Sequence, residues 1–252
     1  MNELRALIFD VDGTLADTER DGHRIAFNRA FAEAGLDWDW SAELYGDLLS
    51  VAGGKERIRF YLDKYRPDVP SLEDSFIAEL HATKTKHYRE LLALGEIPLR
   101  PGVKRLISEA RAEGIRLAIA TTSALPNVTA LLENNLDPSW FEIIAAGDIV
   151  PAKKPAPDIY HYVLKQMNLQ PHDCLVLEDS LHGMQAAIGA GLPTVVTVND
   201  YTKEQDFSKA LLVLSHLGEP ELACTILAGD AFDGSYLDIE MLHRLHKSIS
   251  KV

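Results

Sequence analysis

Cysteine is nearly absent from this sequence of 252 residues, which contains only two, Cys174 and Cys224. Two isolated cysteines do not form the closely spaced clusters that bind zinc, so we expect reduced thiols and a cytoplasmic protein. Basic residues are also scarce, because 25 Lys and Arg stand against 38 Asp and Glu, for a net charge of −13. That balance argues against nucleic acid or an anionic membrane as the main partner.

Long hydrophobic runs are missing as well. No apolar run approaches the length of a membrane-spanning helix, and the N-terminus does not resemble a signal peptide. Internal repeats and low-complexity segments are absent too. What is present is an ordinary globular composition, 46% hydrophobic and 25% charged, in a chain long enough for one large domain or two smaller ones.

Short apolar runs rich in β-branched residues predict the strands of a sheet. The first covers residues 6–9, and four more follow at 115–121, 141–146, 174–179 and 194–198. Helix-like segments separate the later runs, among them "RPGVKRLISEARAEG", "PAPDIYHYVLKQMNL" and "SLHGMQAAIGAG". Alternation of fully apolar strands with helices is typical of an α/β fold whose parallel sheet is covered on both faces.

Residues 18–95 differ because they show helical periodicity and no convincing strand. We therefore expect an α/β core formed by residues 1–17 and 96–252, with an α-helical cap, residues 18–95, inserted after the first strand. A cap of this kind favours an active site between the two domains. Near the end of the chain, "YLDIEMLHRLHKSISKV" predicts a terminal helix to which we assign no function.

The strand ends carry the residues best suited to chemistry. In an open parallel sheet, ligands bind outside the carboxyl ends of the strands. Carboxylates gathered there repel one another, and a divalent cation removes that cost. Oxygen ligands alone favour Mg²⁺ over Zn²⁺. The residues concerned are Asp10, Asp12 and Gly13 after the first strand, Thr121, Thr122 and Ser123 at the second, Lys153 and Lys154 after the third, and Glu178 and Asp179 at the fourth.

Mg²⁺ beside a lysine and hydroxyl donors suits a phosphoryl group, whose transition state spreads charge over its equatorial oxygens. In such a site Asp10 could attack phosphorus and form an aspartyl-phosphate. Asp12, two residues further on, could protonate the leaving oxygen and later deprotonate water. Gly13 would let the chain turn sharply beside the ligand.

Four short motifs carry a family resemblance. "FDVDGTL", the strand end at Thr121, "KKPAPD" and "LEDS" resemble, in order, the motifs of the haloacid dehalogenase superfamily of phosphatases and phosphomutases. Within that superfamily the sequence is similar to the CbbY-type sugar phosphatases, which are related to β-phosphoglucomutase, and "TERDGHR" and "GGKERI" in the insert share in this similarity. The resemblance implies a Rossmann-like parallel sheet with a helical cap.

The resemblance also implies residue roles. Asp10 is the implied nucleophile and Asp12 the implied general acid and base. Thr121 and Lys154 would hold the transferring phosphoryl group, with Lys154 preferred over Lys153 because it directly precedes "PAPD". The implied magnesium ligands are Asp10, the main-chain carbonyl of Asp12, and Asp179, with Glu178 either a ligand or a neighbour of the ligands.

Further substrate contacts are expected mainly in the cap. "GGKERIR" combines two glycines with Lys55 and Arg57, a pattern that suits a phosphate, although a solvated helix start explains it too. The other cap candidates have a plain helix-surface role as their alternative, and Trp38 and Trp40 are interpreted as packing residues. The full set of expected substrate-binding residues is Glu19, His23, Gly53, Gly54, Lys55, Arg57, Lys84, Thr122 and Ser123.

CbbY-type enzymes act on xylulose-1,5-bisphosphate, an inhibitor of Rubisco, so the resemblance predicts Mg²⁺-dependent hydrolysis of this sugar to xylulose 5-phosphate. The expected partner is a small sugar phosphate, with neither nucleic acid nor membrane, and the sequence leaves the oligomeric state open, a monomer included. A phosphomutase of the β-phosphoglucomutase type is the alternative, because the core motifs are shared. A non-catalytic sugar-phosphate-binding regulator is a third, and the intact motifs speak against it.

Overall fold

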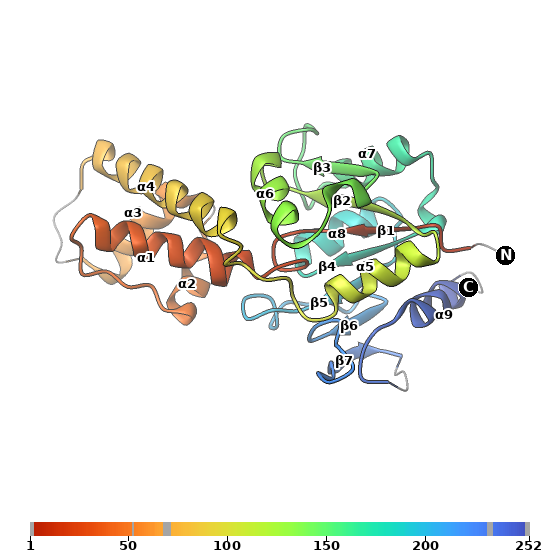
Figure 1. Cartoon of the computed structure of the whole chain (residues 1–252). Coiled ribbons are helices and arrows are strands. Elements are labelled where there is room, and N and C mark those ends of the chain that lie inside the picture. The colour runs from red at the N-terminus through yellow and green to blue at the C-terminus, as the bar shows by residue number, and fades with distance from the viewer. Residues whose placement is uncertain (1–2, 52, 68–71, 231–233, 250–252) are drawn as a thin grey trace. The chain divides into compact units, whose positions relative to one another are not determined.

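The chain forms two compact units (Figure 1). The core unit comprises Met1–Asp17 and Pro98–Val252, and the cap unit comprises Thr18–Ile97. The computed structural model describes residues 3–51, 53–67, 72–230 and 234–249.

The core unit is built on one seven-stranded sheet with the strand order β3-β2-β1-β4-β5-β6-β7. The first six strands run parallel to their neighbours, and β7 runs antiparallel to β6. β1 lies between β2 and β4, with Phe9 opposite both Ile119 and Leu177. The strands are β1 (Ala6–Phe9), β2 (Arg116–Thr121), β3 (Ile143–Ala146), β4 (Cys174–Glu178), β5 (Thr194–Thr197), β6 (Leu212–Leu214) and β7 (Ile226–Gly229).

The five strands predicted from the sequence are present as β1 to β5, although β3 begins at Ile143 instead of residue 141. The parallel sheet is confirmed for β1 to β6, whereas the prediction misses β6 and the antiparallel strand β7. β6 covers only 3 residues of the apolar run at 210–214, and most of β7 is exposed.

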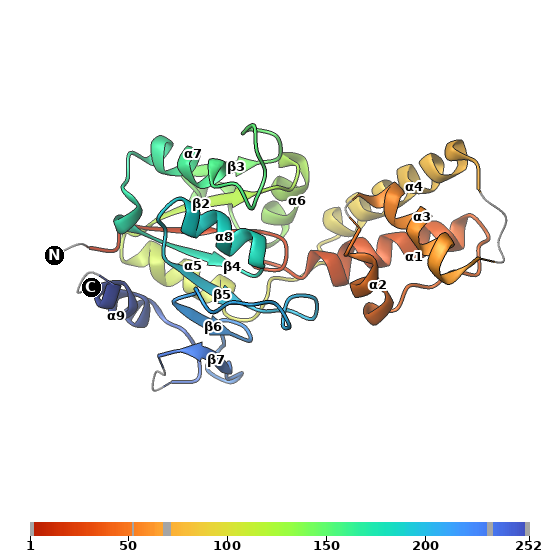
Figure 2. The ribbon, with the colours of Figure 1, turned by 180° about the vertical axis from the view of Figure 1, so that it is seen from behind.

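Helices cover both faces of the sheet (Figures 1 and 2). α5 and α6 lie on one face, and α7 and α8 lie on the other, so the central strand β1 is fully buried. α5 buries Leu106, Ile107 and Ala110, the apolar stripe seen in its sequence, and α9 packs against α5. The helices are α5 (Val103–Ala112), α6 (Leu125–Asn135), α7 (Asp158–Met167), α8 (Leu181–Gly189) and α9 (Ile239–Ile249), with 3₁₀ turns at Pro138–Trp140 and Pro171–Asp173.

The described residues of the cap unit form helices joined by loops, with no strand among them, and are held by an aromatic core. Trp40 is fully buried and packs against Phe27, Phe31 and Tyr61, with ring centroids 4.7 to 5.3 Å apart, which confirms its interpretation as a packing residue. No helix within the described ranges is long and apolar enough to cross a bilayer. The helices are a π-helical turn over Thr18–His23, α1 (Arg24–Glu33), α2 (Ala42–Leu48), α3 (Gly54–Tyr65) and α4 (Asp74–Ala93).

Candidate active site

Three buried carboxylates meet at the carboxyl ends of β1 and β4. Asp10 directly follows β1, Glu178 is the last residue of β4, and Asp179 comes next. The parallel register sets Phe9 beside Leu177, and the Asp10 N–H donates to the Leu177 carbonyl at 3.0 Å. One carboxylate oxygen from each of the three acids lies within 4.8 Å of the other two. We call Asp10, Glu178 and Asp179 the acid cluster.

Lys154 supplies positive charge to this cluster. Its Nζ donates to Asp10 Oδ1 at 2.6 Å and to Glu178 Oε1 at 2.5 Å, and also to the Ala120 carbonyl of β2 at 2.9 Å. Burial lowers the pKa of Lys154, but the two carboxylates outweigh it and raise that pKa well above its ordinary value. Lys153 is exposed and pairs with Asp148 at 2.9 Å, so Lys154 is the lysine of the "KKPAPD" motif that contacts the acids.

The acids carry more negative charge than this lysine offsets. Burial, and after it the neighbouring Glu178 and Asp12, raise the pKa of Asp10 to about 8 despite Lys154. Burial, Asp10 and Glu178 likewise raise the pKa of Asp179 well above its ordinary value. A cation in the cluster would reverse these shifts by favouring the ionised carboxylates.

The carboxylate oxygens around Asp179 could serve as ligands of a hard divalent cation. Its carboxylate accepts from Asn199 Nδ2 at 2.7 Å and from Thr14 Oγ1 at 3.5 Å, and both donors are neutral. Three buried carboxylates lie close together, and Lys154 is the cation that contacts two of them. Such a group of carboxylate oxygens matches the preference of Mg²⁺ for oxygen ligands. The cluster is therefore a candidate metal site made of the residues that the sequence pointed to.

Both oxygens of Glu178 are already engaged. Oε1 accepts from Lys154 and, at 2.6 Å, from the Tyr160 hydroxyl, and Oε2 accepts from the Asp179 N–H at 3.2 Å. A methyl group at Gly183 in α8 would overlap this carboxylate, so only glycine fits there. Glu178 is thus fixed from several sides, and this arrangement suits a group that orients the ligands as well as one that binds the metal.

Ser123 links the second strand end to Asp12. Its hydroxyl donates to Asp12 Oδ2, and its backbone N–H donates to Thr121 Oγ1 at 3.1 Å. Thr121 is buried, whereas Thr122 is exposed. On the sequence alone, Thr122 and Ser123 are equal candidates for substrate contacts. In the structure, Ser123 contacts Asp12, the predicted general acid and base, whereas Thr122 lies on the surface.

The cap unit contains its own polar cluster, formed by Glu19, His23, Tyr45, Arg57 and Lys84. Lys84 Nζ lies 2.8 Å from His23 Nδ1 and 4.8 Å from the centre of the Phe27 ring. Burial lowers the pKa of Lys84 to about 8, although Glu19 raises it. The Tyr45 hydroxyl donates to Glu19 at 2.6 Å and accepts from Arg57 at 2.9 Å.

The predicted residues of the "GGKERIR" segment differ in setting. Gly53 and Lys55 are exposed at the start of α3, and Gly54 is half-buried against the His81 ring. Arg57 also donates to the carbonyls of Leu48 and Val51, at 3.2 and 3.3 Å, so its guanidinium holds the cap together internally.

Sequence reasoning missed Asn199, Tyr160 and Arg100. Asn199 lies two residues after β5, where an asparagine is as typical of a turn as of a functional site. Tyr160 sits within the apolar stripe of α7, where a tyrosine is indistinguishable from an ordinary core residue. Arg100 lies in the proline-rich crossing "LGEIPLRPG", and composition alone gives no hint that its side chain is buried.

Comparison with known proteins agrees with this geometry. The model of haloacid dehalogenase-like hydrolases matches residues 4–191. Protein CbbY, plasmid, from Cupriavidus necator is 50% identical over 223 residues, covering 86% of this chain and 87% of that protein. A crystal structure of a CbbY variant from Rhodobacter sphaeroides in complex with xylulose-1,5-bisphosphate has a TM-score of 0.71 at 46% identity, over 86% of this chain and 96% of that one.

A β-phosphoglucomutase structure from Clostridium difficile has a TM-score of 0.66 at 20% identity, over 99% of this chain and 100% of that one, a likeness that shows the fold alone. The chain therefore belongs to the haloacid dehalogenase-like hydrolases. Within that family it is a phosphatase of the CbbY type, as the motifs predicted.

Proposed function

We propose that this protein is a Mg²⁺-dependent phosphatase that converts xylulose-1,5-bisphosphate into xylulose 5-phosphate and phosphate, and so protects Rubisco from an inhibitor. The observation that carries the chemistry is the contact of buried Lys154 with Asp10 and Glu178 beside Asp179. The support for the substrate is the complex of the Rhodobacter sphaeroides relative with that bisphosphate.

Mg²⁺ would be held by Asp10, the Asp12 main-chain carbonyl and Asp179, with Glu178 as a further ligand or as the group that orients them. When bound, it would offset the negative charge of the acid cluster and of the phosphoryl oxygens. Lys154 and Thr121 would hold the transferring phosphoryl group, the lysine as a buried cation and the threonine through its hydroxyl.

The reaction proceeds in two displacements at phosphorus. A carboxylate oxygen of Asp10 attacks, the bond from phosphorus to the sugar oxygen breaks, and Asp12 gives that oxygen its proton. Water then attacks the aspartyl-phosphate, Asp12 takes a proton from it, and the bond to Asp10 breaks to release phosphate. The hydrogen bond from Ser123 holds Asp12 in place for both proton transfers.

The second phosphate would be bound by the cap unit, and the sugar hydroxyls by cap residues together with Thr122 and Ser123 of the core unit. Lys55 and Arg57, with the backbone of Gly53 and Gly54, are the proposed ligands of the distal phosphate, since they bring two cations and accessible N–H groups to the start of α3. The proposed contacts of the sugar hydroxyls are Glu19, His23, Lys84, Thr122 and Ser123.

Phosphate release from a panel of sugar monophosphates and bisphosphates, with Mg²⁺ or with EDTA, tests this proposal. We expect xylulose-1,5-bisphosphate to give the highest kcat/KM, with xylulose 5-phosphate accumulating, and EDTA to abolish release until Mg²⁺ is restored. Equal or higher kcat/KM on monophosphates would contradict the bisphosphate assignment. Conversion of β-glucose 1-phosphate into glucose 6-phosphate without free phosphate, given a bisphosphate primer, would identify a mutase instead.

Lys55→Ala locates the distal phosphate on the same panel. Loss of a hydrogen bond to a charged group should lower kcat/KM for the bisphosphate by about 10-fold or more, with little change for a monophosphate. Lys64→Ala, an exposed lysine of the same helix, is the matched control and should leave both values unchanged. An equal loss on both substrate classes in Lys55→Ala would place the distal phosphate elsewhere.

A further inference from the structure

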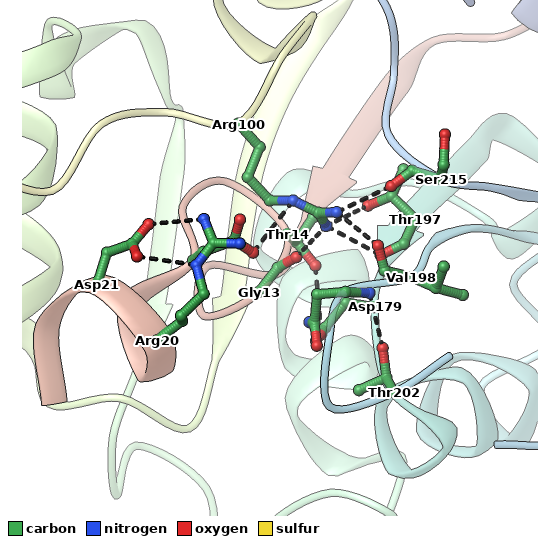
Figure 3. A network of polar contacts seen from close by, with 12 residues as sticks. Gly13, Thr14, Arg20, Asp21, Arg100, Asp179, Thr197, Val198, Thr202 and Ser215 are labelled. Carbon is green, nitrogen blue, oxygen red and sulfur yellow. Dashed lines mark hydrogen bonds and ion pairs between the residues drawn. The ribbon is translucent and has the colours of Figure 1, made fainter. Parts of the chain in front are cut away.

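Arg100 is a buried arginine that the reaction as described above does not use. Its guanidinium donates to four backbone carbonyls, and Figure 3 shows these contacts converging on one side chain. Nη1 donates to Gly13 and, at 3.0 Å, to Thr197, while Nη2 donates to Val198 at 2.5 Å and to Ser215 at 3.0 Å. A planar fork of five N–H donors can serve this many acceptors at once, which the ammonium of lysine cannot.

These acceptors belong to segments far apart in the sequence. Gly13 lies in the loop after β1, Thr197 ends β5 and Val198 follows it, and Ser215 follows β6. Arg100 Nε also pairs with Asp17 Oδ1 at 3.2 Å. Both partners of this ion pair lie in the stretches of the core unit that lead to and from the cap unit, and those stretches are joined by the Ala16–Leu99 bridge.

The loop after β1, whose Gly13 carbonyl accepts from Arg100, packs against Asp179, a predicted metal ligand. Gly13 has a φ of +85°, and a methyl group there would overlap the Asp179 carboxylate and the Asn199 amide. Gly13 therefore lies directly against the Asp179 carboxylate, whose Oδ2 also accepts from Asn199 Nδ2 at 2.7 Å. Arg100 is also a buried positive charge close enough to Asp179 to lower the pKa of that acid.

We propose that Arg100 is a positioning residue of the active site: by tying the Gly13 turn to the ends of β5 and β6, it sets the spacing between that turn and Asp179 on which cation binding and turnover depend. The proposal rests on the proposed function, since it takes Mg²⁺ as the cation. Residues that orient metal ligands without touching the metal are commonly worth 10- to 100-fold in affinity or activity.

Arg100→Lys tests the proposal, because it keeps the charge and removes the fork. The measurements are the Mg²⁺ concentration that gives half of the full rise in Tm, taken without substrate, and kcat and KM for the substrate that the panel identifies. We expect the Mg²⁺ midpoint to rise and kcat to fall, each by about 10- to 100-fold, with KM changed far less.

Arg105→Lys is the matched control. Arg105 also donates to several backbone carbonyls, those of Gly218 and Leu237 at 2.9 and 3.0 Å among them, and it pairs with Glu109 and Glu219. Its contacts lie outside the acid cluster, so this variant should lower Tm while keeping the Mg²⁺ midpoint and kcat.

The outcomes separate the two proposals. If the wild-type protein shows neither a Mg²⁺-dependent rise in Tm nor Mg²⁺-dependent phosphate release, the proposed function fails, and the role of Arg100 fails with it. If the wild type responds and Arg100→Lys matches its Mg²⁺ midpoint and kcat within about 2-fold, only the role of Arg100 is overturned. Should Arg100→Lys fail to fold, Asp17→Asn tests the role of Arg100 instead, because it removes the charge of the Arg100 partner. A higher Mg²⁺ midpoint in Asp17→Asn would support the proposal, and an unchanged midpoint would overturn it.

Discussion

At the residue scale, two buried lysines show how partners decide the charge of the same side chain. Lys154 contacts two carboxylates, and its pKa is raised well above the ordinary value. Lys84 contacts a histidine nitrogen and aromatic faces, and burial lowers its pKa to about 8. The first lysine is therefore a fixed cation, whereas the second carries its charge in the fold at a cost in stability.

Lys84→Met should reveal that cost through its dependence on pH. Below about pH 8 the folded and unfolded states both bind the proton, and the wild type bears the full penalty. Between pH 8 and the ordinary lysine pKa of 10.5, the folded state releases its proton first, so wild-type stability rises with pH. We expect Lys84→Met to gain on the order of 3 kcal/mol at pH 7, less its lost polar contacts, and to lose most of that advantage by pH 10.

Urea unfolding of both proteins at pH 7 and pH 10 checks this prediction. Lys86→Met is the matched control, because Lys86 is exposed on the same helix and pairs only loosely with Glu90 at 3.9 Å. Its effect should be small and alike at both pH values. A stability difference between Lys84→Met and the wild type that does not change with pH would contradict the account of Lys84.

At the element scale, the parallel register brings the chemistry together. β1 and β4 are adjacent, so the residues that follow them in the chain are neighbours in space, and β2 contributes the carbonyl that anchors Lys154. α8 then packs so closely behind β4 that Gly183 lies against the carboxylate of Glu178. A helix start and a strand end thus fix the Glu178 carboxylate between them.

Gly183→Ala tests that packing. The added methyl group must displace the Glu178 carboxylate from Lys154 and Tyr160, which should cost about 1–3 kcal/mol of stability. Because Glu178 is proposed to bind the metal or to orient its ligands, we expect kcat to fall by about 10- to 100-fold as well. Thermal unfolding and phosphate release measure the two effects.

Gly189→Ala is the control in the same helix. A methyl group there would meet Pro157 at an ordinary contact distance of 3.4 Å, so the variant should be neutral or stabilised by about 0.5–1 kcal/mol and fully active. Full activity in Gly183→Ala would mean that the position of Glu178 matters little.

The sequence predicted elements and strand-end chemistry far better than side-chain partnerships. Asp10, Asp179 and Lys154 could be found because each follows or ends an element with a clear pattern. Arg100 could not be, since its acceptors are backbone carbonyls at and just beyond the ends of β5 and β6 and in the loop after β1, whose distance from it in space is set only by the folded sheet. β7 escaped prediction for a related reason: its pairing with β6, and not its own composition, makes it a strand.

At the scale of the whole molecule, an acidic protein is proposed to act on an anion. The net charge of −13 would repel a bisphosphate, so binding must depend on a few cations placed where phosphate groups go. The core unit contributes Lys154, and the cap unit contributes Lys55 and Arg57. The proposal thus assigns one phosphate of the substrate to each unit.

If Asp10 is the nucleophile of a phosphatase, its replacement by the isosteric amide in Asp10→Asn must remove turnover, and kcat is the quantity to measure. The control is Asp148→Asn, an exposed aspartate paired with Lys153, which should retain wild-type kcat. We predict that Asp10→Asn keeps a folded structure and a cooperative thermal transition but loses about 10⁴-fold or more in kcat. Turnover by Asp10→Asn within about 10-fold of the wild type would contradict the account.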